Sequence, residues 1–452
     1  MASDVAWNPS LWESAGGTVP DGWNLVPFAD LLMTPKAIAV GVMYPGEHEQ
    51  TGIPLIRIGD VQDGGVLGDP QMRISASVHE EYRRTELIGD ELLITLVGTP
   101  GACVIAEPRM KGWNVARALA VAKLRDPTLR SFVKAVLESA VMKSIVSGML
   151  NTTVQPTLNL KEIKALPIPL PSEISIARSI GAMADALSDR IDICRQKSQV
   201  LESMAKAIFR SWFIDFDPVR AKADGRSPDV MESATADLFP AQFAETQTGS
   251  IPDGWSLGKL GDVCANPRAQ ARPGEMPPDT PYIGLEHMPK KSIALDRAST
   301  AEGLESGKFW FERDDVLFGK LRPYFHKVGL APCRGVCSTD ILVLRPNAPI
   351  WLGFLAMHAA SDDLISYTTQ LSNGARMPRT SWHDVAAFKV VIPSEGVARA
   401  FNDLVHPLFQ RIYANIATAK VLADLKDALL PRLISGKLRL PECQEESREV
   451  IA

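Results

Sequence analysis

The motif Val19-Pro20-Asp21-Gly22-Trp23 occurs a second time in the chain, as Ile251-Pro252-Asp253-Gly254-Trp255, and this recurrence decides the fold. Each copy continues into a segment that contains leucine residues. Because a proline, an aspartate, a glycine and a tryptophan keep their order and spacing, the pair indicates an internal duplication.

Further matches follow the first one in the same order along both halves of the chain. The offset between matching positions drifts from 232 to 222, as expected when loops differ in length while helices and strands are kept. We therefore predict two copies of one unit of about 220–230 residues. The matching segments are 54–58 with 281–285, 89–94 with 313–318, and Asn151, Pro156, Ile163 and Pro171 with Asn373, Pro378, Val385 and Pro393.

Composition limits the class of protein. The chain has 452 residues, of which 46% are hydrophobic and 22% are charged, so it has enough material for two to four domains. It contains no apolar run of membrane-spanning length and starts without a basic segment leading into an apolar one, so we expect a cytoplasmic protein. The six cysteines are scattered, which favours free thiols, and Cys333 and Cys337 alone make a weak case for zinc. The net charge of −5 excludes a uniformly basic surface but not a local one.

The first part of each copy has the pattern of a mixed domain. Short apolar runs broken by glycine and proline predict strands, and the segments 129–150 and 351–371 predict helices between them. The expected fold class is therefore α+β. The predicted strands are 55–61, 91–96 and 119–124 in copy one, and 316–321 and 341–344 in copy two.

The second part of each copy predicts a long helix. Apolar residues alternate in steps of four and three, which is the seam of a coiled coil. The alternative is that each segment is an ordinary core helix of its own domain. A helix of about 35 residues would be about 50 Å long, far longer than most core helices, which favours the coiled coil. We expect the two helices to pack on each other, antiparallel, as a spacer. The seam positions are Ile180, Ala184, Leu187, Ile191, Cys194, Ser198, Leu201, Ala205, Ile208 and Trp212 in the first helix, and Phe401, Val405, Leu408, Ile412, Asn415, Ala419, Leu422, Lys426 and Leu429 in the second.

These patterns predict five segments with an internal pseudo-two-fold repeat. The expected boundaries are 1–171 for the first globular domain, 172–214 for the first helix, 215–249 for a linker, 250–393 for the second globular domain, and 394–440 for the second helix and tail.

Four more stretches carry recognisable local sequences: 252–260, Leu317-Phe318-Gly319-Lys320-Leu321-Arg322-Pro323-Tyr324, 211–219 and 429–436. They resemble the specificity subunit of type I restriction–modification systems. The first resembles the opening of that family's target recognition domains, the second a strand and loop of the same domains, and the last two the ends of its two long helices. Together, in order and duplicated, they cover the chain from about residue 19 to 440.

The resemblance implies a protein that selects DNA and performs no chemistry itself. Each target recognition domain would recognise one half of a split, asymmetric target in double-stranded DNA, and the helices would set the gap. Two modification subunits would carry S-adenosylmethionine and methylate adenine at N6. Restriction subunits would use ATP and Mg²⁺ to translocate and cut unmodified DNA. No cofactor, metal or catalytic residue is expected on this chain, and the proposed process is phage defence.

The sequence agrees with a non-catalytic role. No phosphate-binding G-x-x-x-x-G-K-[ST] motif occurs, and no Asn/Asp-Pro-Pro-aromatic run of the adenine methyltransferases is present. Two alternatives stay open. A scaffold of paired helices holding two protein-binding domains would show no salt-dependent affinity for DNA, and a degenerate methyltransferase would bind S-adenosylmethionine by itself.

Candidate DNA-binding residues follow predicted strands. In copy two, basic and aromatic side chains alternate after the predicted strand 316–321. This pattern is typical of a loop that follows a DNA groove. The alternative is that these side chains lie on a solvated strand edge. Copy one has fewer charges there, and Gly98-Thr99-Pro100-Gly101 stands in place of Leu321-Arg322-Pro323, so the two domains are expected to recognise different half-sites. The candidates are Lys320, Arg322, Tyr324, His326, Lys327, Arg376 and Arg379 in copy two, and Arg57, Thr95, Thr99, Arg109, Lys111, Arg117 and Gln155 in copy one.

A partner-binding cluster is predicted at the end of the first helix. Phe209, Trp212 and Phe213 form an apolar group larger than one partner helix requires, and a capping cluster of the protein's own core is the equally weighted alternative. Because the chain is duplicated, two copies of one partner could dock in equivalent places.

Overall fold

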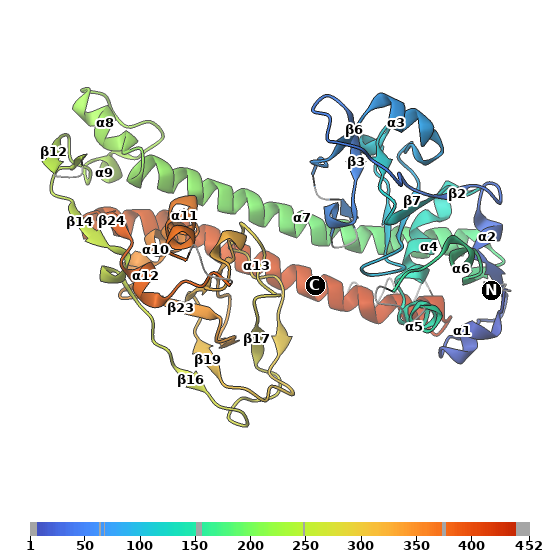
Figure 1. Cartoon of the computed structure of the whole chain (residues 1–452). Helices are drawn as coiled ribbons and strands as arrows, with labels where there is room; N and C mark the ends of the chain where they lie inside the picture. Colours follow the sequence, from blue (N-terminus) through green and yellow to red (C-terminus); the bar gives the residue numbers. More distant parts are fainter. Residues whose placement is uncertain are drawn as a thin grey trace. The chain divides into compact units, whose positions relative to one another are not determined.

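The computed structural model describes residues 7–62, 65–66, 68–150, 156–246, 249–372 and 377–439. The chain divides into two compact units (Figure 1). Unit 1 contains residues 1–190 and 422–452, and unit 2 contains residues 191–421. The long helices α7 (Ile174–Phe213) and α13 (Glu395–Ile434) each contribute to both units.

Unit 1 combines short strands with short helices. Its main sheet has the order β2-β10-β7-β8 and is antiparallel throughout. In a second sheet, β6-β3-β9, the strands β3 and β9 are parallel. The helices are α1 (Ser10–Ser14), α2 (Phe28–Leu31), α3 (Ala76–Glu81), α4 (Arg130–Leu137), α5 (Ala140–Met149) and α6 (Leu160–Lys164), and the strands are β1 (Trp23–Pro27), β2 (Ile38–Val40), β3 (Ile53–Ile56), β4 (Val61–Gln62), β5 (Gly65–Val66), β6 (Arg73–Ile74), β7 (Leu92–Thr95), β8 (Cys103–Ile105), β9 (Asn114–Val115), β10 (Leu119–Ala122) and β11 (Pro167–Pro171).

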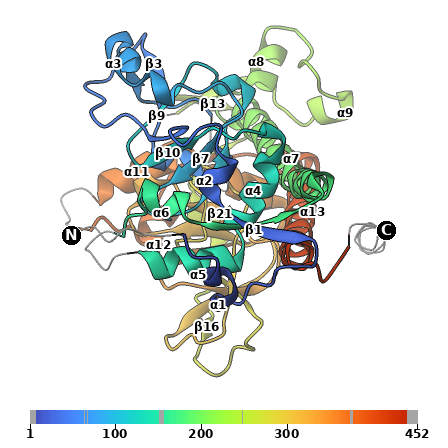
Figure 2. The ribbon, with the colours of Figure 1, turned by 90° about the vertical axis from the view of Figure 1, so that its right-hand side faces the viewer.

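The main core of unit 1 lies between this sheet, its helices and the parts of α7 and α13 that belong to the unit. Figure 2 shows α4 beside the start of α7. A Cβ on Gly181 would lie only 2.7 Å from the backbone nitrogen of Phe132, so glycine permits the close approach of these two helices. Phe132 is fully buried in the same core.

Unit 2 repeats the strand order of the main sheet. Its main sheet is β15-β23-β20-β21, antiparallel throughout, and a second sheet again contains a parallel pair, β17 and β22. The pair β14-β24 corresponds to β1-β11 of unit 1. The helices are α8 (Asp217–Ala223), α9 (Ser233–Ala236), α10 (Leu352–Ala359), α11 (Asp362–Leu371) and α12 (Trp382–Ala386), and the strands are β12 (Phe243–Thr246), β13 (Gly249–Pro252), β14 (Ser256–Lys259), β15 (Cys264–Ala265), β16 (Gln270–Ala271), β17 (Pro281–Ile283), β18 (Ser299–Thr300), β19 (Lys308–Phe311), β20 (Val316–Gly319), β21 (Val328–Leu330), β22 (Gly335–Cys337), β23 (Ile341–Pro346) and β24 (Lys389–Ile392).

A buried carboxylate beside the central strand is also repeated. In unit 1, Glu91 is fully buried and accepts hydrogen bonds from the backbone N–H groups of Ile88 and Gly89, while Lys123 lies 3.7 Å from its Oε1. In unit 2, Asp315 is 1% exposed and forms two hydrogen bonds with Arg345, at 2.8 and 2.6 Å. A buried carboxylate requires such partners, since its desolvation is otherwise strongly unfavourable.

The long helices contact each other within each unit. In unit 2, the Asn415 side-chain amide donates to Ser198 Oγ at 3.3 Å, and Trp212 packs on Phe401 with ring centroids 5.7 Å apart. In unit 1, Lys426 Nζ donates to Ser188 Oγ at 2.9 Å. The two polar positions that interrupt the predicted seam of α13 therefore have hydroxyl partners on α7.

The sequence prediction of a mixed helix and sheet fold with two long helices is confirmed. The helix α7 has 40 residues and α13 also has 40, slightly more than expected. The segment 215–249, predicted as a linker, contains α8, α9 and β12. None of the helices in the described ranges is both long and apolar enough to cross a membrane.

Candidate nucleic-acid interface

The loop between β20 and β21 of unit 2 is a compact turn that presents basic and aromatic side chains. Its 3-10 turn, Pro323–Phe325, is flanked by Arg322 and His326, whose φ angles are 51° and 50°. Positive φ is unfavourable for residues with a Cβ, so the surrounding contacts must hold this turn in shape. Strain of this kind is often found where a loop contacts a ligand.

His326 is the internal support of this turn. The residue is 5% exposed, its Nε2 lies 3.0 Å from the carbonyl oxygen of Ala360, and its Nδ1 lies 3.4 Å from Asp362. Burial lowers the pKa of His326. His326, a DNA-binding candidate from the sequence, is therefore buried beneath the loop and supports it.

The turn also carries a group of aromatic rings and cations that contact each other. The exposed Tyr324 packs against Phe325 with ring centroids 4.8 Å apart. Arg322 and Lys290 both lie over the Phe325 ring, at 5.9 and 5.0 Å from its centroid. Cations over an aromatic face are held in place while their charge stays accessible.

Residues on either side of the turn complete the basic surface. The backbone N–H of Arg322 donates to the carbonyl of Pro378, and Leu321 forms a β-bridge with Arg379, so the 377–380 segment lies against the loop. Arg379 forms an ion pair with Asp340. Arg376 lies outside the described residues.

The pKa values of two lysines show that positive charges lie close together on this surface. The pKa of Lys320 is lowered by burial and then by the nearby charge of Arg379, with Arg268 adding to the effect. The pKa of Lys327 is lowered by burial and then by Lys290. Lys327 also donates to the carbonyl of Leu285. A polyanion bound here would relieve this repulsion, because its negative charges favour the protonated amines.

In unit 1, two predicted residues lie at one sheet edge. Since β3 and β9 are parallel, Arg57 and Arg117, which follow the ends of these strands, come to the same edge. Arg57 is half-exposed and lies 3.9 Å from Asp60. Arg117 and Lys111 are exposed.

The β7–β8 loop of unit 1 differs from its counterpart in unit 2. Thr95 is 2% exposed, and its hydroxyl donates to the carbonyl of Thr99 and, at 3.3 Å, to that of Ala102. The structure therefore places Thr95 inside the loop, where it shapes the turn, while Thr99 is exposed. Gly98 and Gly101 supply the positive φ angles of this turn, 77° and 87°. Gln155 lies outside the described residues.

Arg109 is an internal bridge in unit 1. Its guanidinium bonds the carboxylate of Glu107 at 2.8 Å and the carbonyls of Val66 and Gly68 at 2.8 and 2.9 Å, and it lies 3.8 Å from Asp69. The hydrogen bond to Glu107 raises the pKa of Arg109. These bonds use most of its donors, so a contact with DNA phosphates would have to compete with them.

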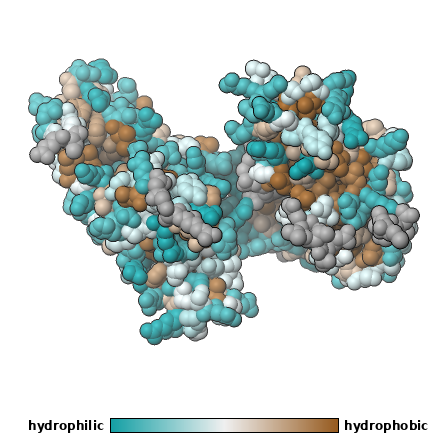
Figure 3. Space-filling model, in the orientation of Figure 1, coloured by the Kyte–Doolittle hydropathy of each residue, from teal (hydrophilic) through white to brown (hydrophobic). Residues whose placement is uncertain are grey.

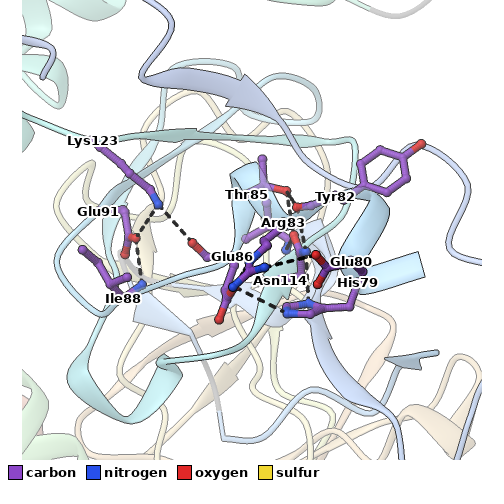
Figure 4. Close-up of polar contacts among 11 residues, drawn as sticks. His79, Glu80, Tyr82, Arg83, Thr85, Glu86, Ile88, Glu91, Asn114 and Lys123 are labelled. Carbon is purple, nitrogen blue, oxygen red and sulfur yellow. Dashed lines mark hydrogen bonds and ion pairs between the residues drawn. The ribbon is translucent and has the colours of Figure 1, made fainter. Parts of the chain in front are cut away.

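A polar network supports α3 of unit 1 (Figure 4). Asn114 is fully buried, accepts from the Thr85 hydroxyl at 2.8 Å and donates to the carbonyl of Tyr82 at 3.2 Å. His79 lies 3.4 Å from the Asn114 amide and 3.7 Å from Glu86. Because its members are bonded to each other, this network stabilises the fold around α3. Among the described residues, no three His, Cys, Asp or Glu side chains converge to hold a metal ion.

The aromatic cluster predicted to bind a partner lies inside unit 2. Phe209, Trp212 and Phe213 are 5%, 6% and 3% exposed and pack on rings of the unit's own core, among them Phe354 and Phe401. Their burial means that these side chains do not form an exposed partner surface in this structure.

The sequence of the chain is similar to those of several curated proteins. It is 20% identical over 335 residues to the type I restriction enzyme MjaIX specificity subunit of Methanocaldococcus jannaschii, covering 70% of this chain and 71% of that protein. It is 23% identical over 332 residues to the HindI specificity subunit of Haemophilus influenzae, covering 63% and 71%, and 28% identical over 238 residues to the EcoBI specificity subunit of Escherichia coli, covering 50% and 48%.

The curated homologues of this chain are type I restriction enzyme specificity subunits. No family model matches it. The crystal structure of the S subunit of a type I restriction-modification system from M. genitalium aligns with a TM-score of 0.53 and 14% identity, covering 92% of this chain and 96% of that one, which shows a shared fold. The sequence resemblance to specificity subunits is thereby confirmed.

Part of the basic surface in unit 2 could not be predicted from the sequence. Lys290 lies over Phe325, and Arg268, which has a φ of 47°, is close enough to lower the pKa of Lys320. The adjacent pair Lys290-Lys291 is a visible signal in the sequence, but Arg268 is isolated there. Lys290 lies 30 residues and Arg268 lies 52 residues before Lys320 in the sequence, so only the fold shows that their loops come close to the β20–β21 loop.

Proposed function

We propose that this chain is the DNA-specificity subunit of a type I restriction–modification complex. Units 1 and 2 would each supply one target recognition domain, covering about residues 1–171 and 250–393, and each domain would recognise one half of a bipartite, asymmetric target. The observation that carries the proposal is one sheet order used twice, with chemically different loops after the equivalent strands β7 and β20.

The basic and aromatic surface of unit 2 supports binding to double-stranded DNA. Lysine and arginine side chains neutralise phosphates, while groups on the same loops can reach base edges. In this proposal Lys320, Arg322, Lys327, Arg379 and Tyr324 contact DNA, and His326 holds their loop. In unit 1, Arg57, Lys111, Arg117 and Thr99 contact DNA, with Thr95 and Arg109 supporting their surroundings.

The long helices would act as an antiparallel coiled-coil spacer between the two recognition domains. The polar pairs Asn415–Ser198 and Lys426–Ser188 support this, because polar residues in a seam fix the register of paired helices. The proposed helical segments are 172–214 and 394–440.

Partner subunits would carry out the chemistry. Two modification subunits would methylate adenine at N6 with S-adenosylmethionine, and restriction subunits would cut DNA with ATP and Mg²⁺, in the cytoplasm, whereas this chain would catalyse no reaction. Apolar side chains reach the surface of unit 2 (Figure 3), and on α7 the exposed Val200 and Met204 line a shallow groove. Val421 has the same register on α13 as Val200 on α7, so two copies of one partner could bind equivalent helix faces.

Selection of DNA from a random duplex library tests the proposal. The chain, co-expressed and purified with its modification subunit, is expected to retain duplexes that share one split motif, with an affinity that falls steeply with salt. Retention without a motif and without salt dependence would favour the alternative, a scaffold that holds two protein-binding domains.

A further inference from the structure

A buried carboxylate on α7 binds a loop of unit 2. Glu202 is 4% exposed, and its Oε2 accepts hydrogen bonds from the Ser292 hydroxyl at 2.8 Å and the Ile293 backbone N–H at 3.0 Å. Lys206 Nζ lies 2.6 Å from its other oxygen. Burying a carboxylate is unfavourable because it loses its hydration, so carboxylates are rarely buried unless contacts such as these offset that cost.

Two more α7 side chains bind the same loop, which we call the 290–296 segment. Arg195 lies 3.3 Å from the Asp296 carboxylate, and Lys206 donates to the carbonyl of Lys291 at 3.5 Å. Arg195, Glu202 and Lys206 are seven and four residues apart, so they share one face of the helix. This face lies beside the apolar seam, and all three of these side chains are charged.

The 290–296 segment is in turn bonded to the basic surface. Lys290 lies over the Phe325 ring, and the backbone N–H of Lys291 donates to the carbonyl of His326 at 2.9 Å. At the other end, the Leu330 N–H donates to the carbonyl of Ile293, also at 2.9 Å. The segment therefore connects α7 to both sides of the loop that carries Arg322 and Tyr324.

We infer that Glu202 is a positioning residue that locks the DNA-contacting surface of unit 2 to α7, so that the helix determines where along the duplex the second half-site is recognised. The inference rests on the proposed function for its consequence at DNA, but the lock itself is a property of the fold.

The second helix lacks this carboxylate. The seam frame places Phe401 of α13 in register with Ile180 of α7, so Ala423 occupies the position of Glu202. An alanine cannot accept hydrogen bonds through its side chain. The position on α13 that is equivalent to Glu202 therefore cannot form the same contact.

Hydrogen exchange tests the lock without reference to function. In Glu202→Ala the Ile293 amide loses its acceptor, and we expect its exchange to rise about tenfold or more, equivalent to about 1.4 kcal/mol. Exchange should rise with it in peptides spanning 320–328. Glu202→Gln, which keeps one acceptor oxygen, should show a smaller rise, and it carries the test if the alanine variant does not fold. Asp403→Asn, which removes an exposed carboxylate from α13, is the matched control. It should leave hydrogen exchange unchanged both at the Ile293 amide and in peptides spanning 320–328. Unchanged exchange at 320–328 would overturn the inference.

Adenine methylation in cells tests the consequence. With the Glu202 variants we expect the preference for the native spacer over spacers one base pair longer or shorter to fall about tenfold, while the preferred bases of both half-sites stay the same. A folded variant that keeps its spacer preference, or that loses methylation equally at all spacers, would overturn the inference. If the wild-type chain itself directs methylation to no split motif, the proposed function fails, and the exchange result still decides whether the lock exists.

Discussion

The loops that follow the equivalent strands β7 in unit 1 and β20 in unit 2 differ in the side chains that they carry. The first is a glycine turn closed by the buried Thr95 hydroxyl, whereas the second is a strained turn that places Arg322 over Phe325. The frame around them is retained, with the same sheet order and a buried carboxylate paired with a cation, Glu91–Lys123 or Asp315–Arg345. The two units therefore share a supporting frame and differ in the loop above it, which is what the proposal of two recognition domains with different half-sites requires.

The largest expected effect comes from breaking the retained frame. In Asp315→Ala, Arg345 loses both hydrogen bonds and the Glu312 N–H loses its acceptor, so we expect the stability of unit 2 to fall by about 3 kcal/mol. Lys123→Ala in unit 1 removes the cation and not the carboxylate. It should cost less, about 1 kcal/mol, because the ammonium lies 3.7 Å from Glu91, which keeps its hydrogen bonds from the Ile88 and Gly89 N–H groups. Hydrogen exchange of β20 and β7 measures the two units separately. Equal losses would show that the two pairs are equivalent.

The next effect concerns acid stability, which should differ between the units. His358 is buried among Phe209, Phe354 and Phe388, and burial lowers its pKa to about 3, below the usual 6.5. Protonation then favours the unfolded chain, so stability present above pH 6.5 is lost as the pH falls toward 3. Between pH 6.5 and 5 the loss should be about 2 kcal/mol.

The equivalent position in unit 1 is Val136, which is also buried. We expect His358→Val to remove most of this pH dependence from unit 2, with His326 contributing a remainder of the same sign, since burial lowers its pKa as well. The measurement is hydrogen exchange of β20 at pH 5 and 6.5, with correction for the intrinsic exchange rate. A slope that persists unchanged in His358→Val would contradict the assignment.

A smaller effect is expected at the basic surface. Replacing Lys290 and Arg322 together by alanine removes both cations from the Phe325 ring, and we expect about tenfold weaker binding to target DNA. The dependence of log affinity on log salt should also become shallower by about 2, if each cation contacts one phosphate. Salt titrations of the complex with its modification subunit measure both quantities, with Lys197→Ala on α7 as an exposed control. An unchanged slope would remove these residues from the interface.

The smallest effect is expected at the unit 1 loop, where the recognition surface depends less on charge. Thr99→Ala removes one exposed hydroxyl, so we expect a change of about 1 kcal/mol or less in the discrimination at one half-site and an unchanged salt slope. Competition between duplexes that differ at single positions of that half-site measures it. A change in the salt dependence instead would show that Thr99 affects phosphate contacts.

The sequence was sufficient to predict those helices and strands whose residue pattern is local or is repeated in both copies. The heptad pattern located both long helices, and its polar members Asn415 and Lys426 have partners on α7. The same pattern did not indicate that Glu202 and Phe209 are buried, because it describes only one face of the helix. The bonds of Arg109 to Val66 and Gly68 were equally invisible, since they join positions more than 40 residues apart.

A genome-wide map of N6-methyladenine, made with this gene present, deleted and restored, tests the central claim most directly. The account predicts that one split, asymmetric motif loses its methylation on deletion and regains it on restoration. A map in which every methylated motif persists after deletion, in cells where the modification subunit is still produced, would contradict it.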